Sequence, residues 1–202
     1  LAGRALPILP AGVATGIAWR ASREIPRTDW KAVPLGGPTV AIQPKVSPDG
    51  HLLSFITSVS GQTQVAVMKP GTGSWTVVTK DRSRGLVNSF AWSIDGGEIY
   101  YDRIIDAPNG IYRVPALGGD ERMVIEQAVN PEPMDDGSLV FLRLNAARQA
   151  QLHRFWPSNG KTEALPFIRD SDLTFFDLLE RLDANHIVAA GKPIGDSKVS
   201  DG

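Results

Sequence analysis

The sequence predicts an all-β protein of the β-propeller type, built from four-stranded antiparallel blades. Three observations lead to this fold class. A turn motif recurs at intervals of 41 to 47 residues, a glycine turn follows it at a fixed distance, and each copy holds four strand-like segments. A four-stranded unit of about 40 residues has the size of a propeller blade, and stacked blades bury faces that no single sheet can cover. A β-sandwich is the alternative all-β fold, but it predicts no repeat.

Length and composition agree with a globular β-protein. The chain has 202 residues, of which 42% are hydrophobic and 21% charged, and its formal net charge is −1. Its 20 glycines and 15 prolines indicate frequent turns, which favour short strands over long helices. The balanced charge argues against nucleic acid as a partner. The absence of cysteine excludes disulfides, thiolate metal sites and cysteine nucleophiles.

The N-terminal segment is apolar and separate from the repeat. Residues 5–19 carry no charge and are followed by several arginines, a pattern typical of a membrane edge. Fifteen helical residues span only about 22 Å of the roughly 30 Å hydrocarbon core, and Pro7 and Pro10 interrupt a helix beyond its first turn. Three interpretations stay open: the end of a membrane helix, an apolar leader on the surface or in disorder, and the remnant of a signal peptide. We assign 1–27 to this segment and a linker.

The repeated motif is an Asp-Gly turn followed by an apolar strand. It is complete as Ser-Pro-Asp-Gly at 47–50 and varied at 93–96. The third copy, at 134–137, lacks the Ser-Pro, and a fourth, degenerate copy has Asp-Ala at 183–184. Successive aspartates are 46, 41 and 47 residues apart. The turn residues of the first three copies, to which we assign a structural role, are Asp49, Gly50, Asp95, Gly96, Asp136 and Gly137.

A second landmark shows that the repeat is not chance. A glycine follows the turn aspartate after 24 residues in each of the first three copies, at Gly73, Gly119 and Gly160. A constant distance inside the copies and variable distances between them are what a single structural unit repeated in tandem gives. These glycines therefore mark a second turn within each unit.

Each unit contains four short strand-like runs. In the second unit, apolar runs at 90–92 and 99–101 flank the Asp-Gly turn and predict a hairpin. An alternating run follows at 110–114, and a fourth run follows the glycine turn at 122–125. The corresponding third and fourth runs of the other two units are 64–68, 75–78, 151–155 and 162–165.

The chain predicts three complete blades and a partial fourth. Twenty-four residues beyond Asp183 lies past the end of the sequence, so the fourth unit is incomplete, and its missing glycine predicts a longer or differently shaped turn. An open arc leaves sheet edges and apolar faces uncovered. Residues 30–35 resemble an outermost strand and are expected to complete the last blade of the ring in a longer protein. The propeller is assigned to 28–202, with blades at about 42–80, 87–126, 128–166 and 175–202.

The turn motif and the strand after it resemble the TolB-type propeller repeat, over about residues 28 to 190. This resemblance implies the fold and says little about function. The segments around the repeat are similar to the C-terminal propeller regions of bacterial membrane-anchored Ser/Thr protein kinases. The segments that carry this similarity are 30–35, 64–70, 118–122 and 153–157. In such proteins an effector domain precedes one membrane helix and the propeller, and 5–19 would stand where that helix belongs.

The resemblance implies a non-catalytic interaction or sensor domain in the cell envelope, membrane-anchored with the propeller outside the cytoplasm. Its expected partner is a protein or peptide, with a membrane contact through the N-terminal segment. Three alternatives are a free periplasmic protein of the TolB kind, the propeller of a winged-helix transcriptional regulator and the propeller of a prolyl oligopeptidase. The flanking sequence of the full-length protein distinguishes them.

No residue pattern indicates catalysis, a cofactor or a metal. The sequence has no Gly-x-Ser-x-Gly elbow, no kinase motif and no zinc spacing. A calcium loop beginning at Asp106 lacks the closing glutamate, and the Asp135 and Asp136 pair is explained by the turn. The histidines 51, 153 and 186 are expected to cap or pack. The strand aromatics, Trp75, Trp92, Tyr100, Tyr101, Phe155 and Trp156, predict core packing, with a ligand-stacking surface as the alternative.

Overall fold

The structure is a computed structural model that describes residues 32, 36–80, 85–168, 179–184, 186–189 and 192–194. The chain divides into two compact units, 1–34 and 35–202, and all strands described below belong to the second. Apart from Ala32, the predicted N-terminal segment 1–27 and the strand expected at 30–35 lie outside the described residues. Among the described residues, no helix is long and apolar enough to cross a membrane.

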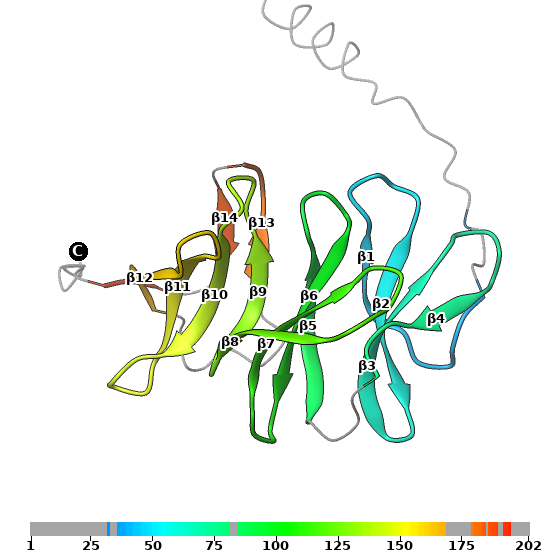
Figure 1. Cartoon of the computed structure of the whole chain (residues 1–202), viewed down its shortest axis with the longest axis horizontal. Helices are drawn as coiled ribbons and strands as arrows, with labels where there is room; N and C mark the ends of the chain where they lie inside the picture. Colours follow the sequence, from blue (N-terminus) through cyan, green and yellow to red (C-terminus); the bar gives the residue numbers. More distant parts are fainter. Residues whose placement is uncertain are drawn as a thin grey trace, which may run out of the picture. The chain divides into compact units, whose positions relative to one another are not determined.

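Blade 1 is a four-stranded antiparallel meander. Its strands are β1 (Ile42–Val46), β2 (Leu53–Val59), β3 (Gln62–Met68) and β4 (Trp75–Val77), paired in sequence order. The Ser-Pro-Asp-Gly turn joins β1 to β2, and the second glycine turn joins β3 to β4. Both turns therefore occupy the places that the repeat predicts (Figure 1).

Blade 2 repeats this arrangement. Its strands are β5 (Leu86–Trp92), β6 (Glu98–Ile104), β7 (Gly110–Pro115) and β8 (Arg122–Glu126), again antiparallel and in sequence order. The equivalent turns lie between β5 and β6 and between β7 and β8.

Blade 3 has the same order and one additional strand at its edge. It contains β9 (Val129–Pro133), β10 (Leu139–Leu144), β11 (Ala150–Trp156) and β12 (Lys161–Ile168). The two-residue β15 (Lys192–Pro193) pairs antiparallel with the end of β12. This late segment therefore extends the edge of blade 3, although the sequence assigns 175–202 to the fourth blade.

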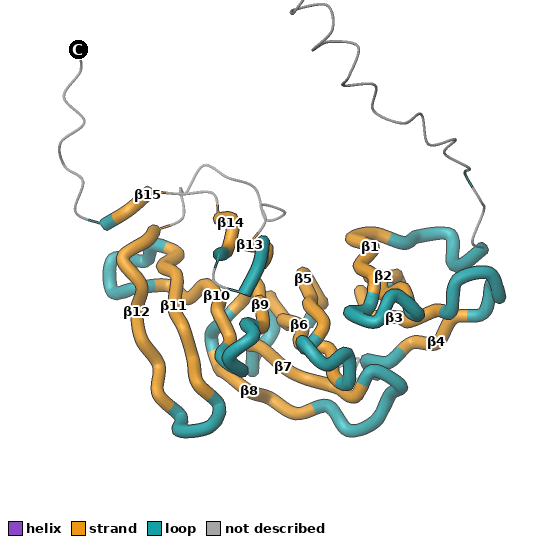
Figure 2. The backbone as a smooth tube through the Cα atoms, turned by 90° about the horizontal axis from the view of Figure 1, so that it is seen from above, coloured by secondary structure: helices purple, strands orange, loops and turns teal. Residues whose placement is uncertain are grey.

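The partial fourth blade consists of one described hairpin, β13 (Leu179–Arg181) and β14 (Ile187–Ala189). Two four-stranded sheets, a third sheet with the same four strands and the additional β15, and the start of a fourth blade confirm the predicted fold class, an all-β partial propeller. Figure 2 shows the blades following one another in chain order from β1 to β14.

The core lies between successive blades, because side chains alternate along each strand and face both neighbours. On β6, Ile99 and Tyr101 pack toward blade 1, whereas Tyr100 packs toward blade 3. A third cluster joins blade 3 to β13 and β14 and includes Leu152 and Leu179. Each fully buried apolar side chain of this kind contributes about 1.5–3 kcal/mol relative to an exposed one.

The first strands of the blades lie next to one another at the inner side of the arc. β1 contacts β5, β5 contacts β9, and β9 contacts β13. The register of β1, β5 and β9 against their second strands shifts at corresponding places, which marks a repeated bulge. A bulge bends its strand and redirects side chains. The ends of these inner strands bring together residues from all four blades.

Candidate functional site

The turn of blade 1 is closed by hydrogen bonds of its own side chains. The Asp49 carboxylate accepts from the Ser47 hydroxyl at 2.5 Å and from the main-chain N–H of His51 at 3.0 Å. The Ser47 hydroxyl in turn accepts from the Leu52 N–H at 2.8 Å. The pKa of Asp49 is lowered, first by the Ser47 hydroxyl and then by the His51 amide. Gly50 follows with φ of 75°, which a residue without a Cβ adopts most readily.

Blade 2 repeats the turn almost atom for atom. Asp95 accepts from the Ser93 hydroxyl at 2.6 Å and from the Gly97 N–H at 3.0 Å, and Ser93 accepts from the Glu98 N–H at 2.9 Å. The Ser93 hydroxyl is the largest cause of the lowered pKa of Asp95. Gly96 has φ of 72°.

The turn of blade 3 is one residue shorter and uses a different serine. Its main chain closes from the Met134 N–H to the Ser138 carbonyl at 2.8 Å, four residues on, where blade 1 closes from Ser47 to Leu52, five residues on. Asp136 accepts from the hydroxyl of Ser138, which follows it, at 2.6 Å. The Ser138 hydroxyl is the largest cause that lowers the pKa of Asp136 to about 2, and Arg154, 2.7 Å away, also lowers it.

The degenerate fourth copy also forms a closed turn. The Leu182 N–H donates to the His186 carbonyl at 2.9 Å, and Asp183 accepts from the His186 N–H at 2.9 Å. The closure spans four residues, as in blade 3 and one fewer than in blades 1 and 2, so of the two predicted alternatives the turn is differently shaped and not longer. In this register Asp183 lies at the position of Asp135, and its alignment with Asp136 is wrong by one residue. In the fourth copy Asp183 accepts the main-chain hydrogen bond of the turn, whereas in blade 3 the next position along, Asp136, accepts it.

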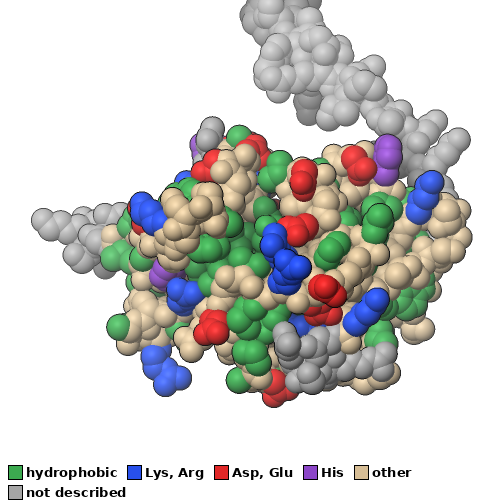
Figure 3. Space-filling view, in the orientation of Figure 1, with side chains coloured by type: hydrophobic (Ala, Val, Ile, Leu, Met, Phe, Trp, Pro, Cys, Tyr) green, Lys and Arg blue, Asp and Glu red, His purple; other side chains and the backbone are tan. Residues whose placement is uncertain are grey.

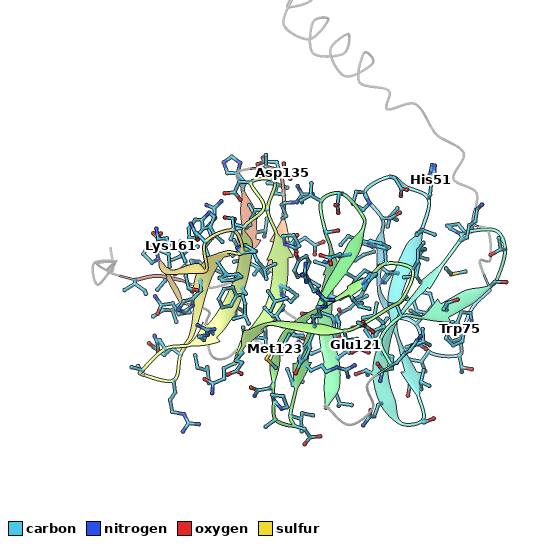
Figure 4. All side chains as sticks on the ribbon, viewed as in Figure 1. His51, Trp75, Glu121, Met123, Asp135 and Lys161 are labelled. Carbon is cyan, nitrogen blue, oxygen red and sulfur yellow. The ribbon has the colours of Figure 1, made fainter. Side chains whose placement is uncertain are left out.

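The predicted turn residues thus hold the hairpins together. Gly137 has φ of 78°, like its counterparts in blades 1 and 2. Gly73, Gly119 and Gly160 all lie in connections between a third and a fourth strand. The carboxylates of the four turns and the residues beside them form one end of the structure, called the turn face below. In Figure 4, His51 and Asp135 mark this end, and Figure 3 shows acidic side chains gathered along it.

A charged cluster lies where the inner strands meet the turn face. Lys45, Ala91, Glu132 and Glu180 occupy the same position in the four blades, two residues before the turn begins. The Lys45 ammonium lies 3.4 Å from the Glu180 carboxylate and so joins blade 1 to the partial fourth blade. We call Lys45, Glu132 and Glu180 the axial cluster.

Glu132 is the buried member of the axial cluster. It is 7% exposed, and its Oε2 has no hydrogen-bond partner within the described part of the chain. Burial is the largest cause that raises the pKa of this carboxyl to about 7; Glu180 also raises it, whereas Lys45 and the Arg181 main-chain amide lower it. A buried carboxylate with a spare oxygen is suited to accept a hydrogen bond from a cationic or amide group.

A cleft opens at the turn face between the turns of blades 2 and 3. Its volume is about 340 Å³, and Tyr100, Glu98, Pro133, Asp135 and Pro157 are among its lining residues. Arg113 pairs with Glu98 at 3.0 Å, and the pKa of Tyr100 is raised first by burial and then by Glu98. Aromatic and proline surfaces beside carboxylates fit an extended peptide with a basic side chain.

The histidines predicted to cap or pack lie on three different elements. His51 is exposed in the turn of blade 1, and His153 on β11 stacks on Phe141 with ring centroids 5.6 Å apart. His186 pairs with Asp183 at 2.8 Å. The Nδ1 of His153 contacts the Gln151 carbonyl at 3.0 Å, and the Nδ1 of His186 contacts both oxygens of the Asp183 carboxylate.

Some of the strand aromatics are buried in the core, and others are exposed or line the cleft. Tyr101 is fully buried and Trp92 nearly so, whereas Tyr100 lines the cleft and Trp75 is partly exposed on the edge strand β4. Trp156 lies under Arg154, whose guanidinium is 5.1 Å from the ring centroid.

Sequence reasoning missed the axial cluster. Its three members are spread over 135 residues and belong to three blades. The available signal was their shared position, two residues before the turn in three copies of the repeat.

No protein-family model and no curated protein matches the chain. Solved structures resemble it. TolB from Acinetobacter baumannii superposes with a TM-score of 0.54 and 16% identity, over 63% of this chain and 32% of that one. The putative TolB from Agrobacterium tumefaciens superposes with a TM-score of 0.55 and 20% identity, over 76% of this chain and 67% of that one. A puromycin-hydrolyzing peptidase from Mycobacterium tuberculosis superposes with a TM-score of 0.51 and 18% identity, over 65% of this chain and 23% of that one.

These comparisons show that the fold is a β-propeller like that of TolB. The same fold occurs in a peptidase, so the fold does not distinguish a binding protein from part of an enzyme. The chain spans about a third of the length of TolB from Acinetobacter baumannii.

Proposed function

We propose that this chain is a non-catalytic interaction domain that binds a protein or peptide through the turn face. The observation that carries the proposal is Glu132, a buried carboxyl whose Oε2 has no hydrogen-bond partner among the described residues. The next residue on β9, Pro133, lines the cleft together with Tyr100 and Pro157. A buried polar group without a partner costs stability and is typical of a functional position. We infer that a lysine or arginine side chain of the ligand supplies the missing donor.

A peptide selection tests this proposal. A library of random peptides displayed on phage is selected on the immobilised chain, and the selected peptides are measured against Glu132→Gln. We expect the peptides to contain lysine or arginine and to bind Glu132→Gln at least tenfold more weakly, since a charge-assisted hydrogen bond contributes about 1.5–3 kcal/mol. Glu126→Gln, an exposed carboxylate on β8, is the matched control. Selected peptides without a basic residue, or unaffected by Glu132→Gln, contradict the proposal.

We further propose that the propeller is the extracytoplasmic part of a bacterial membrane-anchored Ser/Thr protein kinase. The support is the sequence resemblance around the repeat and the uncharged segment 5–19 before it. Ligand occupancy would then bias dimerisation of the membrane helix and thereby the effector domain. A kinase domain upstream in the full-length gene supports this arrangement. A signal peptide, a winged helix or a downstream hydrolase supports instead the free protein, the regulator or the peptidase.

The proposal that this chain itself is not an enzyme has a direct test. The purified chain is incubated with ATP and a protein substrate, and separately with chromogenic peptides. We expect no turnover above the rate in buffer. Turnover that co-purifies with the chain and depends on one of its side chains contradicts the proposal.

A further inference from the structure

A second cavity lies between blades 2 and 3, at the end opposite the turn face. It has a volume of about 390 Å³ and is lined by residues at the start of β9 and the end of β10. Val129, Leu142 and Leu144 form apolar walls, whereas Asn109, Gln127 and Arg143 bring polar groups to the same space. An apolar cavity of this size with a few convergent polar groups is the usual form of a small-ligand site.

Arg143 occupies a position of the repeat that blade 2 also fills with arginine. Arg103 and Arg143 each follow an aromatic residue by two positions on the second strand, and each guanidinium lies 5.3 Å from the centroid of that ring. Each also donates to a main-chain carbonyl that precedes the first strand of its own blade: Gly85 for Arg103, and Glu126, the last residue of β8, for Arg143. The two side chains are therefore held in the same way.

The two arginines differ in their counter-ion. Arg103 is fully buried and lies 3.2 Å from the Glu121 carboxylate and 3.3 Å from the Gln64 amide oxygen. By strand register, Thr162 of blade 3 is the equivalent of Glu121, and Gly110 of blade 2 is the equivalent of Gln64 in blade 1.

The blade 2 equivalent of Gln64, Gly110, offers no side chain to Arg143. A Cβ at Gly110 would lie 2.3 Å from the Ile125 carbonyl oxygen, so this position excludes every larger residue. Among the described residues, Arg143 has no carboxylate partner, and only its Nη2 donates a hydrogen bond. Blade 3 thus keeps the arginine and its aromatic support but has a threonine where blade 2 has the pairing carboxylate, and Arg143 lines the cavity.

We propose that this cavity binds the carboxylate of a ligand with a small apolar body, such as the C-terminal residue of a peptide or a free acylated amino acid. The guanidinium of Arg143 pairs with the carboxylate, the amides of Asn109 and Gln127 offer hydrogen bonds, and the leucines contact the apolar body. A single arginine without a second cation fits a singly charged, planar carboxylate. The site does not depend on the turn face or on its proposed function.

Amide chemical shifts of the ¹⁵N-labelled chain test the site with two probes, N-acetyl-leucine and N-acetyl-leucine amide. We expect the free acid to shift the amides of 127–129 and 142–144, and the amide probe to bind at least tenfold more weakly. Equal affinities, or no shifts with the acid, overturn the proposal. An N-acetylated tetrapeptide ending in leucine distinguishes the sources. Tighter binding than N-acetyl-leucine assigns a peptide end, and equal binding assigns a free acid.

Two variants separate the carboxylate site from a general loss of structure. Arg143→Gln removes the guanidinium and is expected to weaken N-acetyl-leucine at least tenfold. Gln127→Glu keeps Arg143 and places a competing carboxylate in the cavity, with the same expected loss. Arg122→Gln, an exposed arginine on β8, is the control and is expected to bind as the unaltered chain does. If Arg143→Gln does not fold, Gln127→Glu decides, and unchanged binding by that variant overturns the proposal.

Discussion

At the scale of single residues, Asp102 joins two blades through the hydrogen bonds of one carboxylate. Its carboxylate is fully buried on β6 and accepts hydrogen bonds from both β5 and the neighbouring blade. The main-chain donors are Asn88 at 3.0 Å, Ser89 at 2.8 Å and Asn130 at 2.8 Å, and the Ser89 hydroxyl donates at 2.9 Å. Burial raises the pKa of Asp102, and these donors oppose the shift. One side chain thus secures the bulge of β5 and ties blade 2 to blade 3.

We expect Asp102→Ala to lower the free energy of unfolding by about 3–5 kcal/mol, because it leaves several buried N–H groups unpaired at roughly 1–3 kcal/mol each. Urea denaturation measures the change. Asp120→Ala, an exposed loop aspartate, is expected to stay within about 0.5 kcal/mol. A similar small effect for Asp102→Ala would show that water replaces the carboxylate.

Glu132 makes stability depend on pH. Its pKa of about 7 in the folded chain exceeds the ordinary value of about 4.3 expected when unfolded, so the folded state binds the proton more tightly. The contribution of Glu132 to the free energy of unfolding is therefore fully present below about pH 4. It is lost as the pH rises through about 7, which lowers the free energy of unfolding by roughly 2–4 kcal/mol. Urea denaturation between pH 4.5 and 7.5 measures this slope.

Comparison with Glu132→Gln isolates the contribution of this carboxyl, because the other shifted carboxyls remain in both proteins. Asp136, with a lowered pKa, acts with the opposite sign and only below about pH 4. Parallel stability profiles for the two proteins between pH 4.5 and 7.5 would contradict the role of Glu132.

At the scale of the element, a buried ion pair fixes the contact between blades 1 and 2. Arg103 on β6 donates a hydrogen bond to Gln64 on β3 of blade 1. Glu121, just before β8, pairs with Arg103 and accepts a hydrogen bond from the Tyr101 hydroxyl. The Glu121 side chain is 11% exposed. The pKa of Tyr101 is raised first by burial and then by Glu121. The loop between β7 and β8 is thereby held against the blade interface.

We expect Glu121→Ala to cost about 3–5 kcal/mol of unfolding free energy, since it leaves a buried guanidinium without its counter-ion. Combining it with Arg103→Met removes both charges and is expected to recover part of this loss. Chemical denaturation of the single and double variants measures both effects. A double variant less stable than Glu121→Ala would show that packing of the arginine, not its charge, matters at this interface.

The elements also show what the sequence could predict. Strands and turns follow from local signals: alternating apolar residues, Asp-Gly pairs and a fixed distance of 24 residues to the second turn. Predicting the axial cluster would have required knowing that the inner strands of blades 1, 3 and 4 meet at one end, and no local sequence pattern contains that information. The edge position of β15 was unpredictable for the same reason, because pairing with β12 is a long-range choice. Among the described residues Arg143 lacks the carboxylate partner that Arg103 has, and this difference is found only when equivalent positions of the two blades are compared in three dimensions.

At the scale of the whole molecule, stability is distributed blade by blade. Each blade packs mainly on its neighbours, so the chain behaves as a short linear array. Blade 2 is covered on both faces, by the cluster around Val67 and Tyr101 and by the cluster around Ile111 and Phe141. The hairpin β13–β14 packs on blade 3 through Leu179 and Ile187 and has only two strands. The hairpin is therefore expected to open before the other blades.

This arrangement predicts unequal responses to two leucine truncations. Leu179→Ala removes a side chain that is 6% exposed from the contact of the hairpin with blade 3, at a cost of about 2–4 kcal/mol. We expect amide exchange in β13 and β14 to accelerate at least tenfold while β2 and β6 keep their protection, because only local opening changes. Leu139→Ala, between blades 2 and 3, is expected to accelerate exchange throughout those blades. Hydrogen exchange followed by mass spectrometry measures both patterns. Uniform acceleration by Leu179→Ala would mean that the blades unfold as one cooperative unit.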